Sequence, residues 1–181
     1  MKTLAAALLV FAAACGAGRA IFNVDVVSFL QPSGKDTIGY NVPAAPISVS
    51  ADSFITPQKI SLPSGLGKST VDSVTVTAAA VAENTSGTGS ATFQVYFSKD
   101  SATVYGTTAY ISASGTISGT QPSTVPLLAP STVSLADSVF NTNTLWVGIH
   151  AAVTKNAGPA LIGRVRVTTL LLRIVLQDKV F

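Results

Sequence analysis

Cysteine, histidine, tryptophan and glutamate each occur once in these 181 residues, as Cys15, His150, Trp146 and Glu83. A lone cysteine cannot form an internal disulfide, so the fold must be held together by its hydrophobic core. One imidazole, with acidic residues scattered singly, does not make a metal site, and one glutamate offers little for paired-carboxylate hydrolysis. The sequence therefore predicts no catalytic residue, no metal ligand and no cofactor.

Charge is also scarce. Only 10% of the residues are charged, against the ~25% of ordinary soluble domains. The chain has 11 basic and 8 acidic residues and no basic cluster that could neutralise phosphates, so we expect no nucleic-acid partner. Serine and threonine supply the polar surface instead, as is common in secreted β-proteins.

The first residues form the one long apolar run. Lys2 precedes an apolar stretch from Leu4 to Ala14 that closes on small residues. The stretch is shorter than the ~20 residues that a membrane-spanning helix needs. A charged start, an apolar centre and a small-residue end are typical of a secretory signal peptide.

The segment from Phe11 to Gly16 resembles a bacterial lipoprotein signal, in which cleavage just before a cysteine exposes that cysteine for acylation. The resemblance implies that Cys15 is lipidated and that the membrane is a partner. It also implies a cell-envelope protein, in the outer or cell-surface membrane. The alternative is ordinary signal-peptidase cleavage after Ala14 or Ala17, which would leave a secreted protein.

This reading divides the chain into a signal peptide (1–14), a tether (15–20) and one β-sandwich domain (21–181). Within the domain, short segments of alternating apolar and β-branched residues are separated by turn signals, and no segment is convincingly helical. The pattern predicts an antiparallel β-sandwich with jelly-roll-like or immunoglobulin-like (Ig-like) Greek-key connections. The expected strands are 21–30, 47–55, 60–62, 71–81, 92–98, 110–117, 132–135, 145–153 and 161–176.

Three local expectations go with this pattern. The slip in alternation at Val26-Val27 predicts a β-bulge within the first strand. Strands 71–81 and 92–98 should form a hairpin, with Phe93, Val95 and Phe97 buried on one face. The proline-rich stretch 118–131 should be a long surface loop.

The C-terminal strand changes character along its length. We expect Val165 and Val167 to face the core, with Leu171 continuing their face. Leu170 and Leu172 would then need cover from a loop or a partner. If both are exposed, they form an apolar patch through which the chain could assemble as a homo-oligomer.

Two short motifs have structural alternatives. Gly67-Lys68-Ser69 mimics the end of a phosphate-binding loop, but the required earlier glycine is replaced by Leu62 and a strand follows, so we expect a turn. Asn84-Thr-Ser86 matches a glycosylation acceptor, which has little use in a bacterial lipoprotein.

The candidate ligand-binding residues are Trp146, His150 and Tyr96. Trp146 and His150 alternate with the apolar residues of their strand, and Tyr96 has the same position in its own strand. All three should therefore lie on an outer sheet face, where aromatic rings can stack on sugars. In the alternative arrangement, Trp146 packs under a loop such as 118–131 and His150 is a sheet-face residue without a task.

Three functions remain open at this point. The first is a non-enzymatic, lipid-anchored envelope protein with a structural or protein-interaction role. The second is a carbohydrate-binding module that uses Trp146 and exposed tyrosines. The third is a hydrolase with a spatially assembled Ser/Asp/His150 site, although no Gly-x-Ser-x-Gly elbow presents a nucleophile.

Overall fold

The computed structural model describes residues 19–62, 70–118, 121–129, 132–135 and 138–177. Its strands are β1 (Arg19–Asp25), β2 (Thr37–Val42), β3 (Val49–Phe54), β4 (Gln58–Ser61), β5 (Thr70–Ser86), β6 (Gly89–Ser98), β7 (Ile111–Ile117), β8 (Ser123–Leu128), β9 (Thr132–Leu135), β10 (Thr144–Lys155) and β11 (Leu161–Gln177). The short helical turns are α2 (Val27–Leu30), η1 (Gln31–Ser33), η2 (Val104–Gly106) and η3 (Ser138–Phe140). Within the described residues, no helix is long and apolar enough to cross a membrane.

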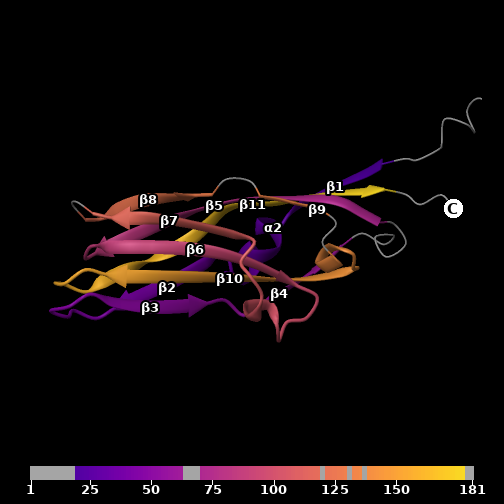
Figure 1. Ribbon diagram of the computed structural model, residues 1–181. Helices are drawn as coiled ribbons and strands as arrows, with labels where there is room; N and C mark the ends of the chain where they lie inside the picture. The colour runs from indigo at the N-terminus through magenta and orange to yellow at the C-terminus, as the bar shows by residue number, and fades with distance from the viewer. Residues whose placement is uncertain (1–18, 63–69, 119–120, 130–131, 136–137, 178–181) are drawn as a thin grey trace, which may run out of the picture.

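The strands form two antiparallel sheets, so the predicted β-sandwich is confirmed (Figure 1). In the described part of the chain, one sheet has six strands in the order β1-β11-β5-β8, with β2 also paired to β11 and β9 to β5. The other has five strands in the order β3-β10-β6-β7, with β4 also paired to β10. The longest strands, β5, β11 and β10, thus form the middle of the sandwich.

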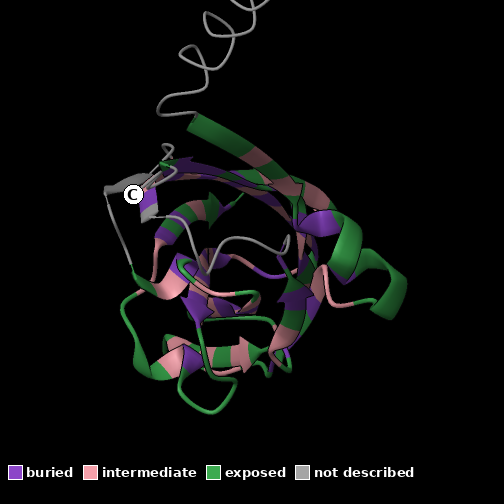
Figure 2. Ribbon diagram, turned by 90° about the vertical axis from the view of Figure 1, so that its right-hand side faces the viewer, coloured by how far each residue is buried: buried purple, intermediate pink, exposed green. Residues whose placement is uncertain are grey.

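The core lies between the sheets, and buried and exposed residues alternate along most strands (Figure 2). Phe93, Val95 and Phe97 of β6 are fully buried, as their alternation predicts. In β10 the predicted apolar face is also buried, from Leu145 to Val153 at every second residue. The opposite parity of β10 therefore faces outward and carries Trp146 and His150.

The predicted hairpin of 71–81 with 92–98 is wrong. β5 pairs with β11, β8 and β9, whereas β6 pairs with β10 and β7, so the two strands lie in different sheets. β5 also continues to Ser86, five residues beyond the predicted end of the strand at 81. Gly87, with φ 78°, permits the sharp turn that carries the chain across to β6.

The predicted faces of β11 hold only for its first half. Val165 and Val167 are buried, but the pairing with β5 shifts between Val167 and Thr169. This β-bulge reverses the parity, since one extra residue turns every later side chain to the other face. Leu170 and Leu172 are consequently buried in the core and Leu171 is exposed, so Leu170 and Leu172 cannot form a surface patch.

Two further predictions fail locally. The first strand ends at Asp25 rather than continuing through a bulge, because the Asp25 carboxylate accepts the N–H of Val27 at 3.1 Å and a helical turn follows. The stretch 118–131 contains strand β8, which lies at the sheet edge beside β5 and accommodates Pro126 there. Cys15, the signal segment and Gly67-Lys68-Ser69 lie outside the described residues.

Candidate functional site

The outer surface of the five-stranded sheet carries a group of aromatic and polar side chains. We call it the aromatic face. It consists of side chains from β3, β6, β10 and η2, namely Asp52, Phe54, Gln94, Tyr96, Tyr105, Trp146 and His150. The register of β10 with β3 and β6 brings Asp52, Phe54 and Gln94 alongside His150, whereas Trp146 lies further along β10.

His150 is at the centre of this face and is held at both ring nitrogens. Nδ1 lies 2.7 Å from Oε1 of Gln94, which is directly opposite on β6. Nε2 lies 2.9 Å from Oδ1 of Asp52, on β3. The ring itself is almost buried, whereas the Asp52 side chain is 60% exposed. His150 therefore fixes the orientation of a carboxylate and an amide that ligands can reach.

Phe54 covers His150 from the outside. The two rings are nearly parallel, at 7°, with centroids 4.2 Å apart. Tyr105 contacts Phe54 edge-on at a centroid distance of 4.9 Å. Even so, Phe54 is 53% exposed, although its bulk and apolarity suit a core position. One face of a rigid aromatic ring is thus presented to solvent beside polar groups.

Tyr105 lies across Gly148 and closes the gap between β10 and the end of β3. Its hydroxyl lies 2.6 Å from the carbonyl oxygen of Ile55 and accepts the N–H of Ile149 at 3.2 Å. Burial raises the pKa of the Tyr105 phenol to about 12. A Cβ on Gly148 would lie 2.7 Å from the Tyr105 ring, so a larger residue here would displace that ring.

The three residues predicted from the sequence are only partly brought together. Tyr96 joins the group, since its hydroxyl donates to Oε1 of Gln94 at 3.0 Å and its ring contacts Tyr105. Burial, and then the charge of Asp52, raise the pKa of the Tyr96 phenol.

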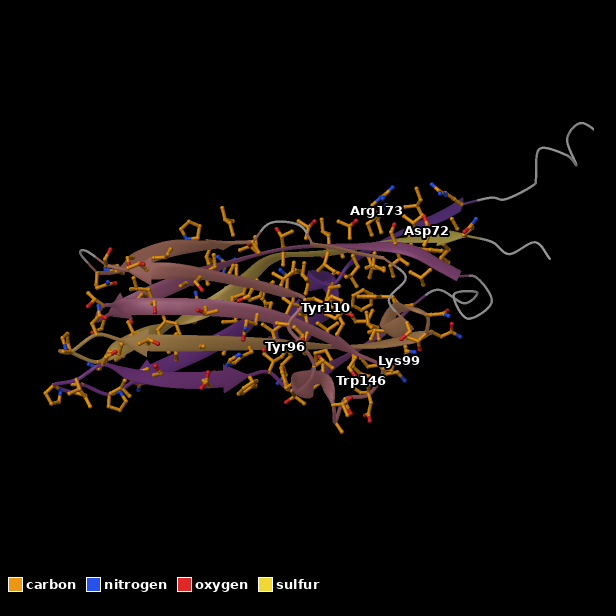
Figure 3. The ribbon with its side chains drawn as sticks, viewed as in Figure 1. Asp72, Tyr96, Lys99, Tyr110, Trp146 and Arg173 are labelled. Atoms are coloured by element: carbon orange, nitrogen blue, oxygen red, sulfur yellow. The ribbon has the colours of Figure 1, made fainter. Side chains whose placement is uncertain are left out.

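Trp146 lies on the same face but towards the end of the sheet, near the turn that holds Lys99 (Figure 3). It is four residues from His150, about 13 Å along a strand. Trp146 is half-buried between Lys59 of β4 and Ser98 of β6. Strand β8, which makes up most of the described part of 118–131, belongs to the other sheet.

Sequence reasoning missed Phe54, Asp52, Gln94 and Tyr105. A signal was present for Phe54, which shares the polar parity of Ser48, Ser50 and Asp52 in its segment. An aromatic residue at an outward-facing polar position is a candidate for exposure to solvent and ligands. Tyr105 gave no signal, because it lies in a short helical turn without periodicity.

The opposite surface of the sandwich carries an ion cluster. Glu83 of β5 accepts two hydrogen bonds from Arg166, at 2.9 and 2.7 Å, and one from Arg164 at 2.5 Å. The hydrogen bonds from Arg166 and then Arg164 lower the pKa of the Glu83 carboxyl. Both guanidinium groups bind the one carboxylate, so the cluster links β11 to β5.

Two observations on the described residues concern catalysis by His150 and metal binding. Both nitrogens of His150 are engaged by Gln94 and Asp52, so neither is left to activate a serine. Among the described residues, no three His, Cys, Asp or Glu side chains gather where they could hold a metal ion. Asn84 is buried and its amide donates to the carbonyl oxygens of Ser86 and Gly87, so it is inaccessible to glycosylation in the folded chain.

No family model matches the chain, and no curated protein matches it in sequence. Among solved structures, it is similar to a chain of the infectious bursal disease virus Gx strain, with a TM-score of 0.38 and 10% identity over 91% of this chain and 38% of that one. The chain thus spans 38% of the length of that viral chain.

Two other solved structures are similar over most of their own length. TmCBM61 in complex with β-1,4-galactotriose has a TM-score of 0.30 and 13% identity, covering 87% of this chain and 88% of that one. Eiger TNF from S. frugiperda has a TM-score of 0.32 and 8% identity, covering 77% and 92%. At such identities the likeness concerns the arrangement of strands and carries no information about ligands.

Proposed function

We propose that this protein is an exported, non-catalytic β-sandwich that binds glycans on its aromatic face. The observation that carries the proposal is the display of Phe54, whose exposed ring lies beside the exposed carboxylate of Asp52. Sugar rings offer apolar C–H faces ringed by hydroxyl groups. A flat aromatic surface flanked by hydrogen-bonding groups is complementary to both.

Two features of the site support a binding role. The side chains of Asp52 and Gln94, which would bind sugar hydroxyls, are oriented before any ligand arrives. His150 holds each of them through a short contact. Preorganised groups lose less conformational freedom on binding, which favours affinity. Tyr105 and Tyr96 further restrain this part of the sheet.

The proposal includes attachment to the cell envelope through Cys15. Only residues 16–18 separate that cysteine from the start of β1, so an acylated Cys15 would hold the sandwich close to the membrane. A glycan-binding protein in this place would contact surface polysaccharide.

A glycan array tests the proposal with wild-type protein and two variants. Phe54→Ala should weaken binding about tenfold or more, the effect of removing a central aromatic contact. Leu128→Ala is the control, since Leu128 is 71% exposed but lies on β8 in the other sheet. The proposal is wrong if wild-type protein binds no glycan, or if Phe54→Ala binds as well as wild type.

A protein-interaction role is the second candidate. Leu128, at 71% exposure, and Leu171, at 46%, are large apolar residues displayed on the six-stranded sheet. If that surface binds another protein or a second copy of the chain, Leu128→Glu should abolish the association. Sedimentation velocity of wild-type protein and of the Leu128→Glu variant would detect the change.

A further inference from the structure

A hollow opens beside Phe54, where the two sheets meet along β2 and β3. Its volume is about 410 Å3, and it is lined by Lys35, Thr37, Ile38, Gly39, Ser53, Phe54, Ile55 and Thr56. Pockets that take small ligands have volumes from ~300 Å3 upwards, so the hollow is large enough for a sugar unit. Its polar lining is mostly hydroxyl groups.

Lys35 gives this hollow a positive charge. The side chain is half-buried, and within the described residues no carboxylate lies within ion-pairing distance of it. The neighbouring acids, Asp36 and Asp52, do not line the hollow, and Asp52 is turned towards His150. A half-buried lysine with no carboxylate partner among the described residues favours an anionic ligand group, because the two can form a charge-assisted hydrogen bond.

Phe54 is common to the hollow and to the aromatic face. A sugar unit stacked on its exposed ring could therefore direct a substituent into the hollow. Thr37, Ser53 and Thr56 line that space and offer donors and acceptors to sugar hydroxyls.

We propose that this hollow is a subsite for a carboxylated sugar, with Phe54 as its stacking surface and Lys35 as the partner of the carboxylate. This inference rests on the proposed glycan-binding function and adds the chemical class of the glycan. A uronic acid unit has the required combination of an apolar ring face, hydroxyl groups and one carboxylate.

The test compares two probes by titration calorimetry: trigalacturonate and its fully methyl-esterified form, which has the same sugar chain without the negative charges. Wild-type protein should bind the acid more tightly than the ester. Lys35→Gln should weaken binding of the acid roughly tenfold or more, the worth of a charged hydrogen bond, and leave the ester unchanged. Phe54→Ala should weaken binding of both.

Gly39→Leu provides a variant that fills the hollow without removing a contact. A Cβ at Gly39 meets no atom within 4 Å, so the larger side chain should fit the folded protein. It should weaken binding of the acid while the melting temperature stays near that of wild type. Arg173→Gln is the charge control, because Arg173 is exposed on β11 in the other sheet and does not line the hollow.

The outcomes separate the two proposals. If wild-type protein binds acid and ester equally, with both lost in Phe54→Ala, the subsite is wrong and glycan binding stands. If neither probe binds and the glycan array is also empty, both proposals fail. If a polyglutamate peptide binds as tightly as trigalacturonate and depends on Lys35, the carboxylate partner is right but the sugar class is wrong.

Discussion

The ammonium group of Lys155 donates a hydrogen bond of 3.1 Å to the carbonyl oxygen of Ala45, and the lysine is fully buried. It also donates to the carbonyl oxygens of Asn156, at 2.6 Å, and Gly158, at 3.1 Å. Three backbone acceptors thus satisfy a charge that would otherwise be very costly to bury. The contact joins the segment before β3 to the turn between β10 and β11.

Lys155→Met should therefore destabilise the protein. The carbonyl groups of Ala45 and Gly158 would keep the backbone hydrogen bonds that they share, so we expect a loss of about 2 kcal/mol rather than more. Urea denaturation measures it. Lys99→Met, at an exposed turn position, should change the free energy of unfolding by less than about 0.5 kcal/mol. Equal stability of Lys155→Met and wild type would mean that the buried ammonium contributes nothing.

Glu83 should make stability depend on pH. Hydrogen bonds from Arg166 and Arg164 lower the pKa of its carboxyl below the ordinary value of 4.5. The ionised form is therefore favoured in the folded state, and its contribution to stability is present above about pH 4.5 and lost as the pH falls through the lower folded pKa.

Glu83→Gln removes this contribution. The difference in free energy of unfolding between wild type and variant should be largest near neutral pH and shrink in acid. Urea titrations between neutral pH and about pH 3 measure it. Arg166→Gln should reproduce much of the loss, because Arg166 makes two of the hydrogen bonds. A difference that does not vary with pH would contradict the proposed origin.

The sequence was sufficient to predict the β-sandwich, because alternation determines which side chains share a strand face. It was not sufficient to predict which strands pair with one another. The alternation in β5 and β6 is compatible with two arrangements, a hairpin and a pair of strands in opposite sheets. Which of the two forms depends on the pairing of β5 with β11 and of β6 with β10.

The candidate site was predictable in part for the same reason. Parity placed Trp146, His150 and Tyr96 at outward positions of their own strands, and the pairing of β6 with β10 puts these positions on one face. The grouping around His150 depends on the register of β3 against β10, which brings Asp52 and Phe54 alongside. Register across sequence-distant strands comes from packing, so no local pattern could reveal it.

Lipidation of Cys15 stays a prediction. Cys15→Ser should release the protein from the membrane fraction or leave it unprocessed, because acyl chains on this residue would be the anchor. Cell fractionation and an intact mass of the mature protein measure the two effects. A mature chain that begins downstream of Cys15 would contradict the prediction and favour ordinary secretion.

Leu171 and Leu172 give the sharpest test of the fold. They are adjacent in β11, yet Leu172 is fully buried and Leu171 is 46% exposed. Without the bulge between Val167 and Thr169, their positions would be exchanged, as simple alternation from Val165 predicts. Comparing the two alanine variants therefore reports which register the strand adopts.

Leu172→Ala should cost about 2–5 kcal/mol, the range for a leucine removed from a packed core. Leu171→Ala should change stability by no more than about 0.5 kcal/mol, as is usual for surface positions. Both free energies of unfolding come from the same urea titration, and the two variants remove the same atoms. If Leu171→Ala is the costly change, the strand lacks the bulge, and Leu170 and Leu172 return as candidates for a surface through which the chain self-associates.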